Sequence, residues 1–298
     1  MTQPLVTIGI PTYLRPELLN KALASVAAQD YENLEVLVAD NCTPGNAVEE
    51  VIDFYKERIE KLTYIKRQEN IGPLKNFIKL IDEASGEYFM WLADDDEISS
   101  NYVSSLVSIL EKNQDVSTAT GHWIFMLRDG KKLPMPTSSF PQKSAYARAL
   151  RFIWKTDDIF IYGLHRRSIL RKASFPGYWW PNENVILNWA YVFLLDMVLN
   201  GRILISPDYS VQFIYHSYYS KNYDSGKRNS RLVTLVQSIA RRLNVHYFFL
   251  QKISCSINYF AALPFTVVSA VVLCREFFFN FSGVILRKAK RSIAKLAQ

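Results

Sequence analysis

The first 120 residues alternate between short apolar runs and longer segments with helical spacing, and no other feature restricts the possible folds as strongly. The apolar runs, which are rich in β-branched residues, cover residues 5–10, 34–39, 62–65 and 88–92. Segments with helical periodicity lie between them, at residues 17–29, 48–59 and 74–84. Such alternation is typical of a parallel sheet with helices on both faces. The sequence therefore predicts an α/β fold built on a mostly parallel sheet.

Each of the three helical segments is predicted to bury one apolar face. The first would bury Leu19, Ala22, Leu23 and Val26, the second Val48, Val51, Ile52 and Tyr55, and the third Leu74, Phe77, Ile78 and Ile81. The pattern is less regular farther along the chain, where we expect helices near residues 144–154 and 185–199 and a strand at residues 202–205.

Ligands of parallel α/β sheets bind beyond the carboxyl ends of the strands, so the residues after each apolar run are candidate site residues. Pro11, Thr12 and Tyr13 follow the first run, and Asp40 and Asn41 follow the second. Asn70 lies beyond the third run, and the acidic residues 94–96 follow the fourth. A purely structural loop would not require polar and acidic groups at these positions. We therefore predict a binding site at this edge of the sheet.

Asp94, Asp95 and Asp96 form an acidic triplet directly after a very apolar run. Neighbouring carboxylates repel one another, and their removal from water is costly unless a cation balances the charge. Carboxylate oxygens suit Mg²⁺ or Mn²⁺, and Mg²⁺ often shares one or two carboxylates with substrate phosphates. A bound divalent ion would stabilise a nucleotide diphosphate as the leaving group of a sugar transfer. The alternative is a solvated acidic turn that caps a helix starting near Ser99 or Ser100.

The motifs of the N-terminal part resemble those of family 2 glycosyltransferases, which have the Rossmann-like GT-A fold and include bacterial surface-polysaccharide and O-antigen enzymes. The matching stretches are residues 6–13, 25–29, 34–41, 70–72 and 85–88, together with Asn76 and the acidic triplet. The resemblance covers residues 4–125 well and residues 126–220 loosely. It implies a metal-dependent, inverting transfer of a sugar from a nucleotide-diphosphate donor. The acceptor would be a glycan or polyprenyl-linked molecule in cell-surface polysaccharide synthesis.

The resemblance also implies roles for individual residues. The donor would be bound by Pro11, Thr12, Tyr13, Arg15, Asp40, Asn70, Lys75 and Asp94, and the metal ion by Asp95 or Asp96, with His216 near the metal or the diphosphate. Tyr13 would lie near the base, Asp40 would accept hydrogen bonds from the base, and Lys75 would meet phosphate. The alternative for Arg15 is a surface ion pair, and for His216 a structural role. The uninterrupted triplet departs from the usual Asp-x-Asp form, so the metal ligand stays open between Asp95 and Asp96.

An inverting transferase needs a carboxylate that removes the proton of the acceptor hydroxyl. Family members often place it in an acidic pair before a helix, near residues 189–190 here, and no acid lies there. Glu183 is the nearest acid and the catalytic base that we favour, with Asp157 and Asp158 as rivals. Asp196 lies within a helical apolar run and is expected to be an ordinary acid of an exposed helix face. A sugar nucleotidyltransferase is the competing enzyme class, but the glycine-rich loop that it needs after the first strand is absent from residues 11–16.

Charge and hydropathy divide the chain near residue 220. Residues 221–298 hold 13 of the 35 lysines and arginines but only two of the 28 acids, and residues 253–274 carry no charge. We expect a GT-A domain over residues 1–220, with a nucleotide-binding half (1–120) and an acceptor half (121–220). A helical, apolar and basic region would follow over residues 221–298. Residues 253–274 are long enough to span a membrane, but they also fit a segment in the headgroup region or a soluble helical domain.

The basic C-terminal region predicts an anionic partner. Its apolar and aromatic content favours a membrane surface over nucleic acid, the partner that a non-catalytic binder would hold. The N-terminus lacks a basic segment followed by a long apolar one, and the three cysteines form no disulfide or zinc pattern. We therefore expect a cytoplasmic protein that associates with the inner face of the cell membrane.

Overall fold

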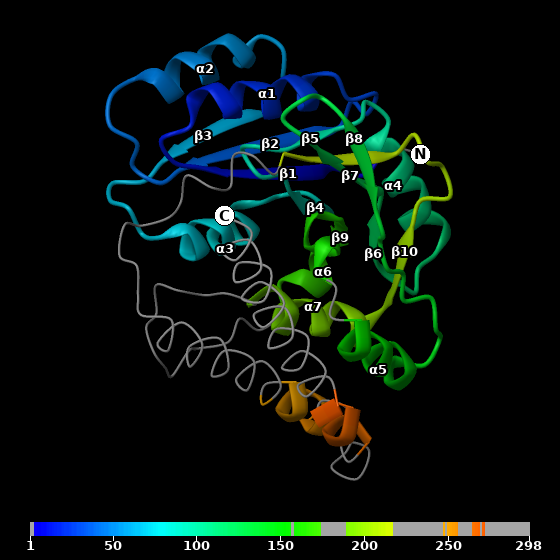
Figure 1. Cartoon of the computed structure of the whole chain (residues 1–298). Helices are drawn as coiled ribbons and strands as arrows, with labels where there is room; N and C mark the ends of the chain where they lie inside the picture. The colour runs from blue at the N-terminus through cyan, green and yellow to red at the C-terminus, as the bar shows by residue number, and fades with distance from the viewer. Residues whose placement is uncertain are drawn as a thin grey trace, which may run out of the picture.

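The computed structural model describes residues 3–155, 158–173, 189–216, 247, 249–255, 264–268 and 270–271. Within these residues the chain forms a large, mostly parallel sheet and a smaller sheet (Figure 1). The large sheet has the strand order β10-β6-β9-β4-β1-β2-β3, in which β9 runs antiparallel to both of its neighbours. Its strands are β1 (Val6–Thr12), β2 (Leu34–Asp40), β3 (Leu62–Lys66), β4 (Tyr88–Trp91), β6 (Val116–Thr120), β9 (Leu164–Arg166) and β10 (Arg202–Ile205). The predicted α/β fold with a mostly parallel sheet is confirmed.

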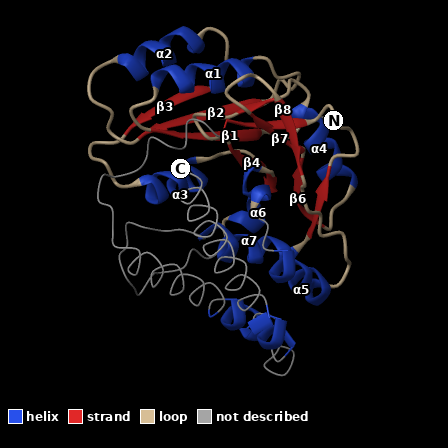
Figure 2. Cartoon of the chain, viewed as in Figure 1, coloured by secondary structure: helices blue, strands red, loops and turns tan. Residues whose placement is uncertain are grey.

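Helices cover both faces of the large sheet, as Figure 2 shows. The helices of one face are α1 (Pro16–Ala27), α2 (Ala47–Lys56) and α4 (Tyr102–Lys112), and those of the other are α3 (Pro73–Glu83), α5 (Ala145–Lys155) and α7 (Trp189–Asn200). The apolar side chains of each set pack into a core cluster of their own against the sheet. Because both faces are buried, the central strands read as continuous apolar runs rather than as alternating ones.

The smaller sheet joins segments that lie far apart in the sequence. Its strand order is β5-β11-β7-β8, with β5 (Glu97–Ile98), β7 (His122–Met126), β8 (Lys132–Met135) and β11 (Gln212–His216). Strand β11 runs parallel to β7 and antiparallel to β5, which directly follows the acidic triplet. Gly121 joins β6 of the large sheet to β7 of the smaller sheet, and a Cβ atom there would lie 2.5 Å from the carbonyl oxygen of Val211. Only glycine allows the backbone just before β11 to approach so closely at this position.

The predicted helices and strands agree with the structure within the described residues, which exclude residues 185–188, but the buried faces of two helices differ from the prediction. In α2, Val51 is only half-buried. In α3, we expected the buried face to contain Leu74, Phe77, Ile78 and Ile81, but the buried residues are Asn76, Phe77, Leu80 and Ile81. The physical reason is the side-chain amide of Asn76, which donates to the Ala39 carbonyl oxygen at 2.7 Å. The same amide accepts a hydrogen bond from Arg67 Nε at 3.0 Å. A polar side chain can face the core here because its hydrogen bonds are satisfied.

The described parts of the C-terminal region are helical and pack on α5 and α7. Phe249, Ile253 and Phe265 are buried in the same core cluster as these two helices. Lys252 forms an ion pair with Asp196 of α7. Among the described residues, no helix has both the length and the apolar content needed to cross a membrane. The predicted domain boundary near residue 220 and much of the uncharged segment 253–274 lie outside the described residues.

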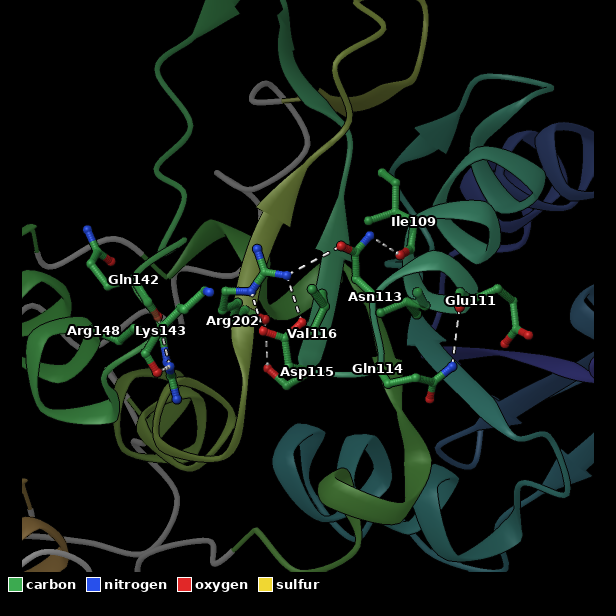
Figure 3. A network of polar contacts seen from close by, with 12 residues as sticks. Ile109, Glu111, Asn113, Gln114, Asp115, Val116, Gln142, Lys143, Arg148 and Arg202 are labelled. Atoms are coloured by element: carbon green, nitrogen blue, oxygen red, sulfur yellow. Dashed lines mark hydrogen bonds and ion pairs between the residues drawn. The ribbon is translucent and has the colours of Figure 1, made fainter.

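Arg148 of α5 ties the carboxyl end of α7 to the body of the protein. Its buried guanidinium donates four hydrogen bonds of 2.6–3.0 Å, to the carbonyl oxygens of Val198, Leu199, Gln142 and Lys143. Figure 3 shows this side chain near Arg202, which binds the carboxylate of Asp115. The last carbonyl groups of a helix lack hydrogen-bond donors within the helix and carry partial negative charge. A buried cation supplies the donors and balances the charge.

The buried His165 of β9 gives the fold a specific pH dependence. Its Nδ1 lies 2.8 Å from the Thr118 hydroxyl and its Nε2 lies 2.9 Å from the Ile161 carbonyl oxygen, so the neutral ring is fully paired. Burial lowers the pKa of His165 from 6.5 to about 4. At pH values between these two pKa values, His165 is protonated in the unfolded chain but neutral in the folded chain. Folding stability therefore decreases on acidification, by up to about 1.4 kcal/mol per pH unit.

We expect His165→Gln to be less stable than the wild-type chain near neutral pH, because the new side chain replaces a well-packed ring. This deficit should shrink as the pH falls through the window between the two pKa values, because the variant carries no titrating group at this position. Thermal unfolding of both chains across that window measures the gap. A gap that stays constant or widens on acidification would contradict the assignment of His165 as a buried neutral histidine.

Candidate functional site

A cavity of about 200 Å³ opens at the carboxyl ends of the central strands. Its walls come from residues at or after the ends of β1, β2 and β4, from the start of α3 and from the 3-10 helix η1 (Ile159–Tyr162). The predicted site residues in the wall are Pro11, Thr12, Tyr13, Arg15, Asp94 and Asp95, and the others are Asn41, Pro73, Asn76, Phe77, Ala93 and Tyr162. The structure thus brings most of the predicted donor residues together around one opening.

Arg15 bridges two carboxylates of the acidic triplet. Its Nη1 atom donates to Asp94 Oδ1 at 3.2 Å and to Asp95 Oδ2 at 3.1 Å. The second oxygen of Asp94 accepts a hydrogen bond from the Thr12 hydroxyl at 2.8 Å. Arg15 follows β1 and the triplet follows β4, and these two strands are neighbours in the sheet. Arg15 therefore belongs to the acidic cluster and is not part of a separate surface ion pair.

Burial leaves the negative charge of the triplet only partly compensated. Asp94 and Asp96 are 6% and 1% exposed, so the alternative of a solvated acidic turn does not describe them. Burial raises the pKa of Asp94 to about 6, although the Arg15 guanidinium acts in the opposite direction. Burial also raises the pKa of Asp95 and of Asp96, and the charge of Asp95 adds to the effect on Asp96. A cation in addition to Arg15 would relieve this conflict.

His216, at the end of β11, lies against the triplet although 120 residues separate it from Asp96. Its backbone N–H donates to Asp96 Oδ1 at 3.2 Å, and its Nε2 lies 2.8 Å from Glu97 Oε1. The hydrogen bond from His216 lowers the pKa of Glu97. The pairing of β11 with β5 produces this contact. The structure therefore places His216 beside the acidic cluster, where its ring is held by Glu97.

Asp40 lies beneath the loops of the site rather than in the cavity wall. It is fully buried, and its Oδ1 accepts from the Thr43 backbone N–H at 3.0 Å and from the Thr43 hydroxyl at 2.6 Å. Its Oδ2 accepts from the Tyr64 hydroxyl at 2.8 Å. The Thr43 hydroxyl in turn accepts from the Leu14 N–H at 2.9 Å. In this arrangement Asp40 holds together the two loops that follow β1 and β2, and its contact with a base stays a prediction.

Asn70 and Lys75 also lie outside the cavity wall. Asn70 Oδ1 accepts hydrogen bonds from Asn41 Nδ2 at 2.7 Å and from the Gly72 N–H at 2.9 Å. Asn41 Oδ1 accepts in return from the Ile71 N–H at 3.0 Å. These bonds fasten the loop before α3 to the end of β2. Lys75 is exposed on the first turn of α3, so its contact with phosphate also stays a prediction.

The wall residues that had no predicted role include Asn41 and Tyr162. Asn41 directly follows Asp40, so the strand-end rule that selected Asp40 applies equally to it. Tyr162 ends the apolar run 159–162 and lies just before the short strand β9. Because β9 is antiparallel to β4 and β6, its start lies at the edge where those strands end. The antiparallel direction of β9 leaves no local signal in the sequence.

Only some of the acids considered as catalytic bases lie within the described residues. Glu183 and Asp157 lie outside the described residues. Asp158 precedes η1 and is partly buried, four residues before the cavity residue Tyr162. Asp196 lies on α7 and forms an ion pair with Lys252 of the C-terminal region, so it is a structural acid rather than an ordinary acid of an exposed face. The favoured base, Glu183, stays a prediction.

The donor set of the acidic cluster fits a metal ion that also binds substrate. No three histidine, cysteine or acidic side chains in the described part of the chain converge closely enough to enclose a metal ion. Mg²⁺ commonly uses one or two carboxylates and completes its coordination with substrate phosphates and water. Asp94 and Asp95 line the cavity, whereas Asp96 is buried and is not part of the wall. One or two carboxylates at the cavity therefore match the requirements of such an ion.

Comparison with known proteins identifies related sequences. Residues 7–174, more than half of the chain, match the family described as Glycosyl transferase family 2. A GalNAc(5)-diNAcBac-PP-undecaprenol beta-1,3-glucosyltransferase from Campylobacter jejuni is 32% identical over 104 residues, which are 35% of this chain and 34% of that protein. A putative colanic acid biosynthesis glycosyl transferase, WcaA, from Escherichia coli is 32% identical over 179 residues, which are 59% of this chain and 58% of that protein. The matched stretches thus span about a third to three fifths of these relatives.

Solved structures share the fold. The crystal structure of S. aureus TarS 1–349 in complex with UDP-GlcNAc superposes with a TM-score of 0.65, at 19% sequence identity, over 92% of this chain and 73% of that chain. The complex of the same protein with UDP superposes with a TM-score of 0.65 at 17% identity, over 92% and 72% of the two chains. At this level of identity the likeness establishes the arrangement of helices and strands.

Proposed function

We propose a function for this chain from the premise that it belongs to glycosyl transferase family 2. The protein moves a sugar from a nucleotide-diphosphate donor to a glycan or lipid-linked acceptor in cell-surface polysaccharide synthesis, with inversion at the reacting carbon. The observation that carries the proposal is the cavity at the strand ends, where the aromatic Tyr13 and the carboxylates of Asp94 and Asp95 share one wall. The family membership favours this activity over the competing sugar nucleotidyltransferase.

The donor site follows from the chemistry of the cavity wall. Tyr13 provides an aromatic surface near the base, and Pro11 and Thr12 line the approach to it. Arg15 holds Asp94 and Asp95 in place and adds positive charge where a diphosphate would lie. The related TarS has been crystallised with UDP and with UDP-GlcNAc, which supports a nucleotide-sugar donor here.

A divalent ion, Mg²⁺ or Mn²⁺, is part of the proposal. Asp95 would bind it from the cavity wall, Asp96 is the second carboxylate within the cluster, and His216 would contribute from β11. When bound, the ion would neutralise the charge that develops on the diphosphate as the glycosidic bond breaks. The incomplete charge compensation of the buried triplet supports this assignment.

The acceptor and the place of action rest on the relatives. The Campylobacter jejuni relative is named for an undecaprenol-linked substrate, and WcaA is named for colanic acid biosynthesis. We therefore propose a polyprenyl-linked or glycan acceptor that is activated by Glu183. The basic region 221–298 would hold the protein at the cytoplasmic face of the membrane, where a lipid-linked acceptor is found.

Donor binding tests the proposed function. Thermal unfolding of the full chain is measured with UDP-, GDP-, CDP- and dTDP-sugars, each with and without Mn²⁺. We expect at least one of these donors to raise the unfolding temperature, and to do so more strongly in the presence of Mn²⁺, because ligands of the folded state stabilise it by mass action. The Mn²⁺-dependent part should disappear in the Asp95→Ala, Asp96→Ala double variant.

The same measurement can contradict the proposal in two ways. If no nucleotide-diphosphate sugar stabilises the wild-type chain, with or without Mn²⁺, the proposed donor site is wrong. If a donor binds equally well with and without Mn²⁺, and also to the double variant, the metal assignment is wrong while the donor assignment stands. The wild-type chain with Mn²⁺ and no nucleotide controls for stabilisation by the ion alone.

A further inference from the structure

Tyr162 is a residue of the cavity wall to which the donor and metal assignments give no role. Its ring packs among Phe213, Trp123 and Phe77, with centroid distances of 5.3, 5.8 and 6.4 Å. Its backbone carbonyl oxygen accepts from the Tyr102 hydroxyl at 3.4 Å. These contacts hold the ring and therefore the direction of its hydroxyl group. Such a residue is already oriented before any ligand arrives.

The hydroxyl group of Tyr162 is available to a ligand. Its oxygen makes no hydrogen bond with the residues that the structure describes, whereas the hydroxyl groups of the buried tyrosines Tyr102 and Tyr88 both have partners. Burial, together with the nearby charges of Asp96 and Asp95, raises the pKa of Tyr162. The phenol therefore stays protonated and can donate a hydrogen bond. A tyrosine placed only to fill the core would not need an unpaired hydroxyl at a cavity.

The order of the strands places Tyr162 at one end of the proposed donor site. Across the sheet the strands follow in the order β9-β4-β1-β2, which is also visible in Figure 1. Tyr13 and Asn41 follow β1 and β2, the acidic triplet follows β4, and Tyr162 precedes the antiparallel β9. A donor with its base near Tyr13 and its diphosphate at the triplet would extend across β4. Its sugar would then lie toward the start of β9.

We propose that Tyr162 contacts the sugar of the donor, by donating a hydrogen bond from its hydroxyl to a sugar oxygen. This inference rests on the proposed function and assigns the sugar end of that site. Arg15 and the divalent ion bound by the carboxylates would hold the diphosphate, so Tyr162 discriminates between a nucleotide sugar and the nucleoside diphosphate that remains after transfer. Tyr162 is thus a specificity-determining residue for the group that is moved.

The test compares two ligands in the full chain. The dissociation constants of the nucleotide sugar found in the donor screen and of its nucleoside diphosphate are measured with Mn²⁺ for the wild-type chain and for Tyr162→Phe. We expect the variant to bind the nucleotide sugar about 3- to 10-fold more weakly, the usual effect of one lost hydrogen bond, and the nucleoside diphosphate with unchanged affinity. Phenylalanine keeps the ring contacts, so a general loss of structure is not expected.

Tyr55→Phe is the matched control, because Tyr55 is also a buried tyrosine but its hydroxyl donates to the Asn20 carbonyl oxygen on α1, away from the cavity. This variant should bind both ligands like the wild-type chain. If Tyr162→Phe weakens both ligands equally, or neither, the assignment to the sugar is overturned while the donor site stands. If the wild-type chain binds no nucleotide sugar, the proposed function fails and the inference falls with it.

Discussion

Replacement of both Asp95 and Asp96 by asparagine is expected to slow sugar transfer at least about 100-fold, the usual scale for the loss of a preorganised electrostatic group. Asparagine preserves the size of each side chain but removes the two negative charges that would attract the divalent ion. The diphosphate would then leave without charge compensation from the metal. The measurement is the initial rate of nucleoside diphosphate release, with saturating Mn²⁺ and with the donor identified by thermal unfolding.

The control for this prediction removes the same charges elsewhere. Asp53 and Asp82 are exposed on α2 and α3, so a variant with asparagine at both positions should retain the wild-type rate. The unfolding temperature of the site variant should not decrease, because burial already disfavours the two carboxylates without a metal ion. A folded site variant whose rate stays within about threefold of the wild-type rate would contradict the catalytic role of the charges.

Replacement of Arg148 by methionine is expected to reduce the free energy of unfolding by about 3 kcal/mol, a large effect for a single substitution. The change leaves four carbonyl oxygens, two of them at the end of α7, without this donor, and the bond to Val198 is fully buried. Buried or half-buried acceptors that lose a charged donor are costly. For a chain of this size the unfolding temperature should decrease by roughly 6–12 °C, measured by calorimetry or circular dichroism.

Arg151→Met is the matched control for this prediction. Arg151 lies on the same helix but is exposed, and its guanidinium donates to the Ser139 carbonyl oxygen at 3.1 Å. Its replacement should change the stability by less than about 0.5 kcal/mol, as is usual for surface positions. Equal effects of the two substitutions would mean that the contact with the end of α7 contributes nothing beyond that of a surface arginine.

Local patterns in the sequence were sufficient to locate the central elements of the fold. The apolar runs became β1–β4, and the periodic segments between them became α1–α3. Asn76 shows where this reasoning fails, because apolar periodicity ranks a polar residue as exposed. Its burial depends on the Ala39 carbonyl oxygen, which belongs to a different element. The spacing of apolar residues within a helix carries no information about a hydrogen-bond partner that a strand of the sheet supplies.

The site shows the same division between local and tertiary information. By itself the sequence determined which residues follow β1, β2 and β4, and hence that Tyr13, Asn41 and the acidic triplet share one edge of the sheet. This is so because parallel strands end at the same edge. Only the tertiary structure decided that Tyr162 completes the cavity and that the ring of His216 meets Glu97. Those contacts depend on the antiparallel β9 and on the pairing of β11 with β5, which packing between distant segments selects and no local pattern encodes.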